Sequence, residues 1–142
     1  MIIAIDFDGT IVEHKYPRIG KPLLFAFETM KQLQKQGHQL ILWTYRSGRE
    51  LHKAVEFCKQ NGVEFYAVNT NYPEEKFDEK NISRKIYADL YIDDRNIGGF
   101  PGWSKVWEMI NKEKADLREH QVQKDINKPD LSNKLKNLFK KG

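Results

Sequence analysis

The chain has 142 residues, 39% of them hydrophobic and 31% charged, and its formal net charge is +4. This length suits one domain with one core, and the composition is that of a globular protein. The sequence has no apolar run of about eighteen residues, which excludes a recognisable membrane-spanning helix. Its first residues also lack the basic start and the cleavage site of a secretory signal, so we expect none.

The charge is unevenly distributed along the chain. Residues 1–110 carry 15 basic and 15 acidic side chains, whereas residues 111–142 carry 9 basic and 5 acidic ones. We therefore expect a core over residues 1–110 and a basic, mostly helical tail over residues 111–142. The tail is either the solvated surface of a helix or a weak contact for nucleic acid or another polyanion.

A single cysteine, Cys58, excludes an internal disulfide. This usage is typical of a reducing compartment, so we expect a cytoplasmic protein. Cys58 lies at helical spacing from Leu51, Ala54 and Val55, which favours a buried structural thiol over a nucleophile.

The chain opens with the apolar run at residues 2–5, which predicts a buried strand because it is short and rich in isoleucine. A loop is expected at residues 11–22, where proline and glycine recur. Apolar residues then recur every three or four positions over residues 23–36, which predicts an amphipathic helix. Gly37 is placed to end it as a left-handed C-cap.

Strands and helices continue to alternate along the rest of the core. Further strands are predicted at residues 39–44, 63–68 and 86–92, and further helices at residues 48–60 and from about Trp103. Such alternation predicts an α/β fold in which helices cover both faces of a parallel sheet, joined by right-handed crossovers. The expected architecture is a Rossmann-like, three-layer α/β/α domain.

Acidic side chains follow two of the predicted strands. Asp6 and Asp8 come directly after the first strand, and Asp93-Asp94 follows the fourth. Thr44 ends the second strand, and Lys85 lies just before the fourth. Because ligands of open parallel sheets bind at the carboxyl ends of the strands, we expect these side chains to form one site.

The chemistry of this set indicates phosphoryl transfer assisted by Mg²⁺. Carboxylates crowded into one pocket repel one another unless a cation joins them, and an oxygen-only site with open positions suits Mg²⁺. One of the two aspartates near the first strand can attack phosphorus while the other handles the proton of the leaving group. Thr44 and Lys85 can bind and neutralise phosphoryl oxygens.

The run Asp6-Phe7-Asp8-Gly9-Thr10, placed after an apolar strand, resembles the first motif of the haloacid dehalogenase superfamily. Thr44, Lys85 and Asp93-Asp94 resemble the second, third and fourth motifs in the same order. The resemblance covers residues 1–110 and implies a hydrolase, most specifically a phosphatase, because phosphatases of this superfamily have an acid at the position of Asp8.

The resemblance also implies a role for each matching residue. Asp6 would be the nucleophile and a Mg²⁺ ligand, and Asp8 would be the general acid and base with its backbone carbonyl on the metal. Asp93 and Asp94 would complete the metal site. Lys85 would bind the phosphoryl group, and the choice between Lys85 and Lys80 stays open at this point.

Many members of the superfamily carry a cap domain, but the two usual insertion intervals here, residues 11–22 and 69–84, are too short for one. An open, capless site is implied. It would suit a bulky phosphorylated substrate, such as a protein or a nucleic acid end, or a partner subunit acting as lid, and small substrates remain possible. The oligomeric state is open, although the tail has a stripe of apolar residues that permits a terminal helix: Leu131, Leu135, Leu138 and Phe139.

Other interpretations remain beside this one. Thr44 is alternatively a simple strand-end hydroxyl, Lys85 a solvated surface residue, and Asp93-Asp94 a cap for the following glycine-containing loop. A phospho-receiver module is disfavoured, because its phosphorylated aspartate ends the third strand and Val68-Asn69-Thr70 has no acid. A degenerate enzyme that binds a nucleotide or polyanion is the main alternative.

The remaining charged residues give weaker signals. Three arginines close to the strand ends are equally consistent with a grip on a substrate anion and with surface salt bridges: Arg46, Arg49 and Arg95. The four histidines show no ligand spacing and are predicted to lie on the surface: His14, His38, His52 and His120.

Overall fold

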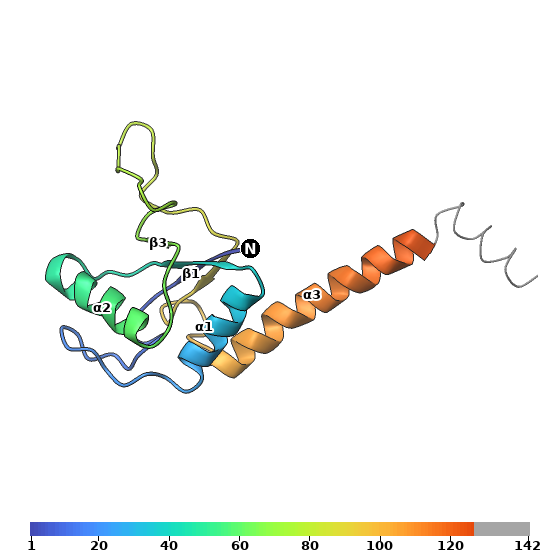
Figure 1. Cartoon of the computed structure of the whole chain (residues 1–142), viewed down its shortest axis with the longest axis horizontal. Helices are drawn as coiled ribbons and strands as arrows, with labels where there is room; N and C mark the ends of the chain where they lie inside the picture. The colour runs from blue at the N-terminus through green and yellow to red at the C-terminus, as the bar shows by residue number, and fades with distance from the viewer. Residues whose placement is uncertain (127–142) are drawn as a thin grey trace, which may run out of the picture. The chain divides into compact units, whose positions relative to one another are not determined.

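The protein, represented by a computed structural model, is described over residues 1–126 (Figure 1). Its strands are β1 (Ile2–Ile5), β2 (Gln39–Leu42), β3 (Ala67–Val68) and β4 (Leu90–Ile92), and its helices are α1 (Ala26–Lys35), α2 (Gly48–Gln60) and α3 (Trp103–Ile126). Residues Met1–Ser104 form one compact unit, and the chain from Lys105 onward belongs to a second. The predicted apolar stripe of the tail, at residues 131–139, lies outside the described residues.

The sheet has four parallel strands in the order β3-β2-β1-β4. The register places Ile5 beside Leu42 on one side and beside Ile92 on the other. Strand β1 is therefore central, which explains why its sequence is apolar throughout instead of alternating. The predicted α/β class and parallel sheet are confirmed.

One face of the sheet is covered by α1 and α2. These helices connect β1 to β2 and β2 to β3, so right-handed crossovers in one direction place both on the same face. Figure 1 shows both helices on the same side of the strands. The ring of Phe27 in α1 lies 5.9 Å from that of Phe57 in α2, and Phe57 also makes an edge contact with Phe7.

The opposite face is covered differently from the prediction. Its buried residues Ala4, Ile41 and Ala67 pack with Ile86, which comes from the long connection between β3 and β4. Residues 69–89 contain no helix (Figure 1). The connection therefore supplies irregular chain where the three-layer prediction requires a helix, because its many polar residues provide only isolated apolar side chains to cover the sheet.

Some element boundaries agree with the predicted ones and others differ. Helix α2 spans the predicted residues, and Gly37 has the expected positive φ of 83° at the end of α1. The third strand is shorter than residues 63–68, because the Val63 N–H is donated to the carbonyl of Cys58 at the end of α2. The fourth strand starts late because the Tyr87 N–H is donated to the side chain of Asn71.

Two simpler expectations can also be checked in the described part of the chain. No helix there combines the length and the apolarity needed to cross a membrane. Cys58 is fully buried, as predicted for a structural thiol, and burial raises the pKa of its thiol to about 12.

Candidate metal and phosphoryl-transfer site

The candidate site lies at the carboxyl ends of β1, β2 and β4. The chain leaves β1 toward β2, whereas β4 lies on the other side of β1. This reversal makes a crevice beside β1, which is where open α/β sheets bind ligands. A cavity of about 950 Å³ opens there, and it is lined by five of the predicted site residues: Asp6, Asp8, Thr44, Asp93 and Asp94.

Three carboxylates converge in this cavity. One oxygen each of Asp6, Asp93 and Asp94 lies within 4.8 Å of the others. Burial and, to a smaller extent, the neighbouring Asp93 and Asp94 carboxylates together raise the pKa of Asp6 to about 7, against the opposing hydrogen bond from the Phe7 N–H. The cluster is thus unfavourable when fully ionised and without a counter-ion.

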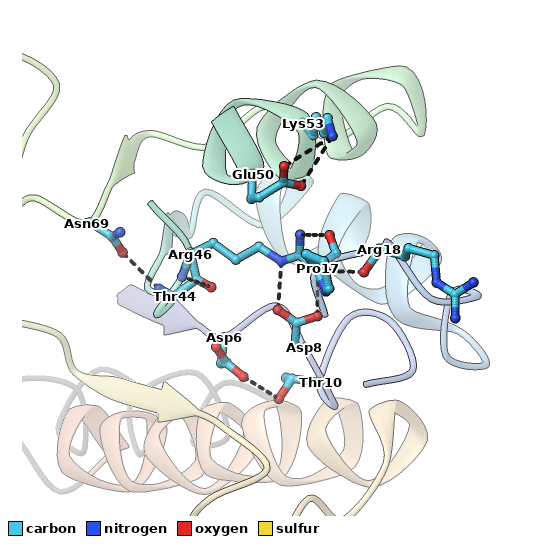
Figure 2. Close-up of polar contacts among 10 residues, drawn as sticks. All are labelled: Asp6, Asp8, Thr10, Pro17, Arg18, Thr44, Arg46, Glu50, Lys53 and Asn69. Atoms are coloured by element: carbon cyan, nitrogen blue, oxygen red, sulfur yellow. Dashed lines mark hydrogen bonds and ion pairs between the residues drawn. The ribbon is translucent and has the colours of Figure 1, made fainter. Parts of the chain in front are cut away.

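The turn after β1 brings the Asp94 loop close to Asp6. Gly9 has a φ of +83°, and a Cβ added there would lie 2.3 Å from Oδ2 of Asp94, so no side chain fits. The fully buried Thr10 hydroxyl donates toward Asp6 Oδ2 at 3.5 Å (Figure 2). It also accepts the Asp94 N–H at 3.1 Å. Thr10 thereby ties the two acidic loops together, and its carbonyl accepts the indole N–H of Trp103 at 2.8 Å.

Asp8 is held by a buried arginine. Nε and Nη2 of Arg46 donate to the two carboxylate oxygens of Asp8 at 2.7 and 2.8 Å (Figure 2). The Arg46 side chain is 1% exposed and that of Asp8 12%. This bidentate pair orients the Asp8 carboxylate and occupies both of its oxygens.

The same guanidinium also fastens the loop at residues 13–21. It donates to the carbonyls of Pro17 and Arg18, at 3.1 and 2.8 Å. It lies over the rings of Phe7 and Tyr16, 4.9 and 5.2 Å from their centroids. The surface salt bridge considered for Arg46 is therefore wrong, since its side chain is buried among partners that are distant in sequence.

Thr44 is positioned by a residue that the sequence patterns did not indicate. The Thr44 N–H is donated to Oδ1 of Asn69, which follows β3 with a positive φ of 54°. The Thr44 hydroxyl accepts the N–H of Arg46 at 3.2 Å. Asparagine tolerates this left-handed conformation better than most residues, which is the only sequence signal that favoured Asn69 here.

Lys85 is not among the residues that line the cavity. Its ammonium lies 5.1 Å from the centroid of the Tyr91 ring. The chain from Lys85 leads to the amino end of β4, where the Asp89 N–H is donated to the carbonyl of Ile2, whereas the cavity lies beyond the other end. Lys80 does not line the cavity either.

The cavity has further lining residues, of which the sequence analysis had considered only the two arginines as contacts for a substrate: His14, Tyr16, Trp43, Tyr45, Arg46 and Arg95. Trp43 and Tyr45 flank Thr44 at the end of a strand, and this position was the sequence signal that could have placed them in the cavity. Arg95 was considered as an anion grip, and its Nε lies 4.0 Å from Asp94 Oδ2.

His38 is buried at 6% exposure, so its predicted surface location is wrong.

The donors present fit a hard divalent cation. Among the residues that the structure describes, the cluster consists of three carboxylates without a nitrogen or sulfur ligand, which is the ligand chemistry of Mg²⁺. A cation would also offset the repulsion that raises the pKa of Asp6. Mg²⁺ itself, and a contribution from the Asp8 carbonyl, stay predictions.

No protein-family model and no curated protein matches this chain. The chain is similar to the solved structure of a conserved protein coded by a locus of Bacteroides thetaiotaomicron. The two are 56% identical with a TM-score of 0.75, over 80% of this chain and 91% of that one. That protein is described only as conserved, so the similarity supports the fold and supplies no activity.

Proposed function

This chain belongs to the same family as the conserved protein from Bacteroides thetaiotaomicron, and we propose that it is a Mg²⁺-dependent phosphohydrolase of the haloacid dehalogenase type. The single observation that carries this proposal is the convergence of Asp6, Asp93 and Asp94 beside Asp8 in one cavity. An aspartate nucleophile, a second acid and a divalent-ion site are the parts that such a phosphatase needs.

The first step would transfer the phosphoryl group to Asp6. A carboxylate oxygen of Asp6 attacks phosphorus, the bond from phosphorus to the ester oxygen breaks, and the leaving oxygen takes a proton from Asp8. Mg²⁺, held by Asp6, Asp93 and Asp94, would neutralise phosphoryl charge when bound. In its hydrogen bond with the Arg46 N–H, the Thr44 hydroxyl oxygen is the acceptor. The hydroxyl proton can therefore be donated to a phosphoryl oxygen.

The second step would return Asp6 to its starting state. Water attacks phosphorus of the aspartyl-phosphate, Asp8 accepts a water proton, and the bond from Asp6 to phosphorus breaks with release of orthophosphate. Arg46 uses one acceptor site on each oxygen of Asp8, whereas a carboxylate offers about four such sites, so Asp8 can donate or accept a proton while this pair stays formed.

The proposal is tested by hydrolysis of p-nitrophenyl phosphate with and without Mg²⁺. We expect Asp6→Asn to remove turnover, because an amide cannot act as the nucleophile. Asp78→Asn is the matched control, since Asp78 is a fully exposed aspartate outside the cavity lining. Equal rates for wild type and Asp6→Asn would remove Asp6 from the chemistry and overturn the proposal.

A second candidate is a catalytically weak protein that binds a nucleotide or polyanion in this cavity. The observation that favours it is the location of Lys85 outside the cavity lining, which leaves the phosphoryl group without the lysine that the family resemblance implied. Phosphate-driven binding weakens as salt rises. Nucleotide binding that falls between two salt concentrations, without Asp6-dependent turnover, would select this candidate.

A further inference from the structure

The cavity is larger than a phosphoryl group and a metal ion require, and it is lined by side chains that neither of them needs. Its volume of about 950 Å³ is at the upper end of the range for whole small-molecule ligands. Three aromatic side chains, Tyr16, Trp43 and Tyr45, line it together with the carboxylates. Aromatic rings neither bind Mg²⁺ nor neutralise phosphoryl oxygens, so they are available to the rest of the substrate.

Tyr45 presents an exposed ring on a well-held stretch of backbone. The residue is fully exposed at 105%. On its two sides, the Thr44 N–H is donated to Asn69 and the Arg46 N–H to the Thr44 hydroxyl. A ring with few rotatable bonds on an anchored backbone loses little conformational entropy when a ligand stacks on it.

Tyr16 adds a second exposed ring from a different segment. The guanidinium of Arg46 lies over its ring at 5.2 Å, yet the residue remains 58% exposed. Both tyrosines line the cavity and are exposed, whereas Asp6 is partly buried, which favours a position of their rings nearer the opening than the Asp6 carboxylate. A ligand ring stacked there would be separated by a spacer from a phosphate at Asp6.

We propose that the substrate is a nucleoside monophosphate, with the base stacked on Tyr45 and the phosphate at the carboxylate cluster. This inference rests on the proposed phosphohydrolase function. The ribose supplies the spacer between base and phosphate, whereas an aryl phosphate holds its ring next to phosphorus. Stacking on aromatic side chains is tolerant of base identity, so we expect several bases to be accepted. Arg95, whose side chain is 79% exposed, adds positive charge beside Asp94.

The first test compares KM for nucleoside 3′- and 5′-monophosphates with KM for ribose 5-phosphate. Tyr45→Ala should raise KM for the nucleotides about 5- to 150-fold, which corresponds to the usual contribution of base stacking. Ribose 5-phosphate should be unaffected, and Tyr45→Trp should retain nucleotide KM. Tyr87→Ala is the matched control, because Tyr87 is 67% exposed and lies outside the cavity lining.

The second test measures binding without turnover. Adenosine monophosphate is titrated calorimetrically into Asp6→Asn protein, and the same titration is repeated after adding Tyr45→Ala. We expect the second substitution to weaken binding by the same factor as it raises KM. A loss of binding with Tyr45→Ala but not with Tyr87→Ala would tie the effect to this ring.

The outcomes separate this inference from the proposed function. Asp6-dependent hydrolysis with equal kcat/KM for nucleotides and ribose 5-phosphate, unchanged by Tyr45→Ala, would overturn the substrate and keep the phosphohydrolase. A Tyr45-dependent preference for p-nitrophenyl phosphate over every nucleotide would also overturn it, in favour of aryl esters. Tyr45-dependent nucleotide binding without hydrolysis would support the base-binding surface and overturn the phosphohydrolase.

Discussion

The ion pair between Asp8 and Arg46 should contribute strongly to folding stability as well as to the site. Arg46→Met leaves Asp8 without its partner and the carbonyls of Pro17 and Arg18 without a donor. Removing one member of a buried pair costs about 3–5 kcal/mol. Because a domain is stable by only about 5–15 kcal/mol, that loss would be a large fraction of the free energy of unfolding.

A double-mutant cycle with urea denaturation measures this coupling. Asp8→Asn and Arg46→Met should each lower the free energy of unfolding, and the double variant should lose less than their sum, by about 0.5–3 kcal/mol. Arg46→Lys should rank between wild type and Arg46→Met, because lysine keeps the charge without the bidentate geometry. Arg49→Met is the control and should leave the midpoint unchanged, since the Arg49 side chain is 82% exposed.

The result that contradicts this reasoning is additivity. If the effects of Asp8→Asn and Arg46→Met summed within about 0.5 kcal/mol, the two side chains would be energetically independent. Their bonds, at 2.7 and 2.8 Å, would then have no measurable consequence in solution.

Three further predictions follow from the site and the core. Gly9→Ala should lower the thermal midpoint and weaken Mg²⁺ binding measured by calorimetry. The Cβ of the new alanine would lie 2.3 Å from Asp94 Oδ2, and the backbone φ of +83° disfavours a side chain. Unchanged Mg²⁺ binding would refute the close approach of Gly9 to Asp94. The pKa of Asp6 rises from 3.8 to about 7 on folding. Without metal, the folded state therefore binds a proton at Asp6 that the unfolded state releases between about pH 4 and 7. The free energy of unfolding should fall as pH rises through this range. Thermal melts in EDTA should show this fall for wild type and not for Asp6→Asn, and equal slopes would remove Asp6 as the cause. Native Cys58 should not react with a thiol reagent at neutral pH until urea unfolds the chain, because its pKa is about 12 and it is buried; rapid native labelling would contradict this.

The sequence alone identified the features that depend on short stretches of chain. The apolar run of β1, the helical spacing of α2 and the position of Gly37 are local patterns, and the structure has them where they were predicted. Strand ends were also locatable, and parallel strands bring their carboxyl ends to one edge. For that reason Asp6 and Asp93-Asp94 could be assigned to one cavity before any distance was known.

Only the tertiary structure decided how the site is held together. Arg46 is 38 positions from Asp8, and the Thr10 hydroxyl is 84 from the Asp94 N–H that it accepts, so no local pattern links them. The irregular cover contributed by Ile86 likewise depends on packing against strands distant in sequence. Lys85 is a different case: it precedes β4 in the sequence and therefore approaches the amino end of that strand, so its assignment to a site at the carboxyl ends overlooked this order.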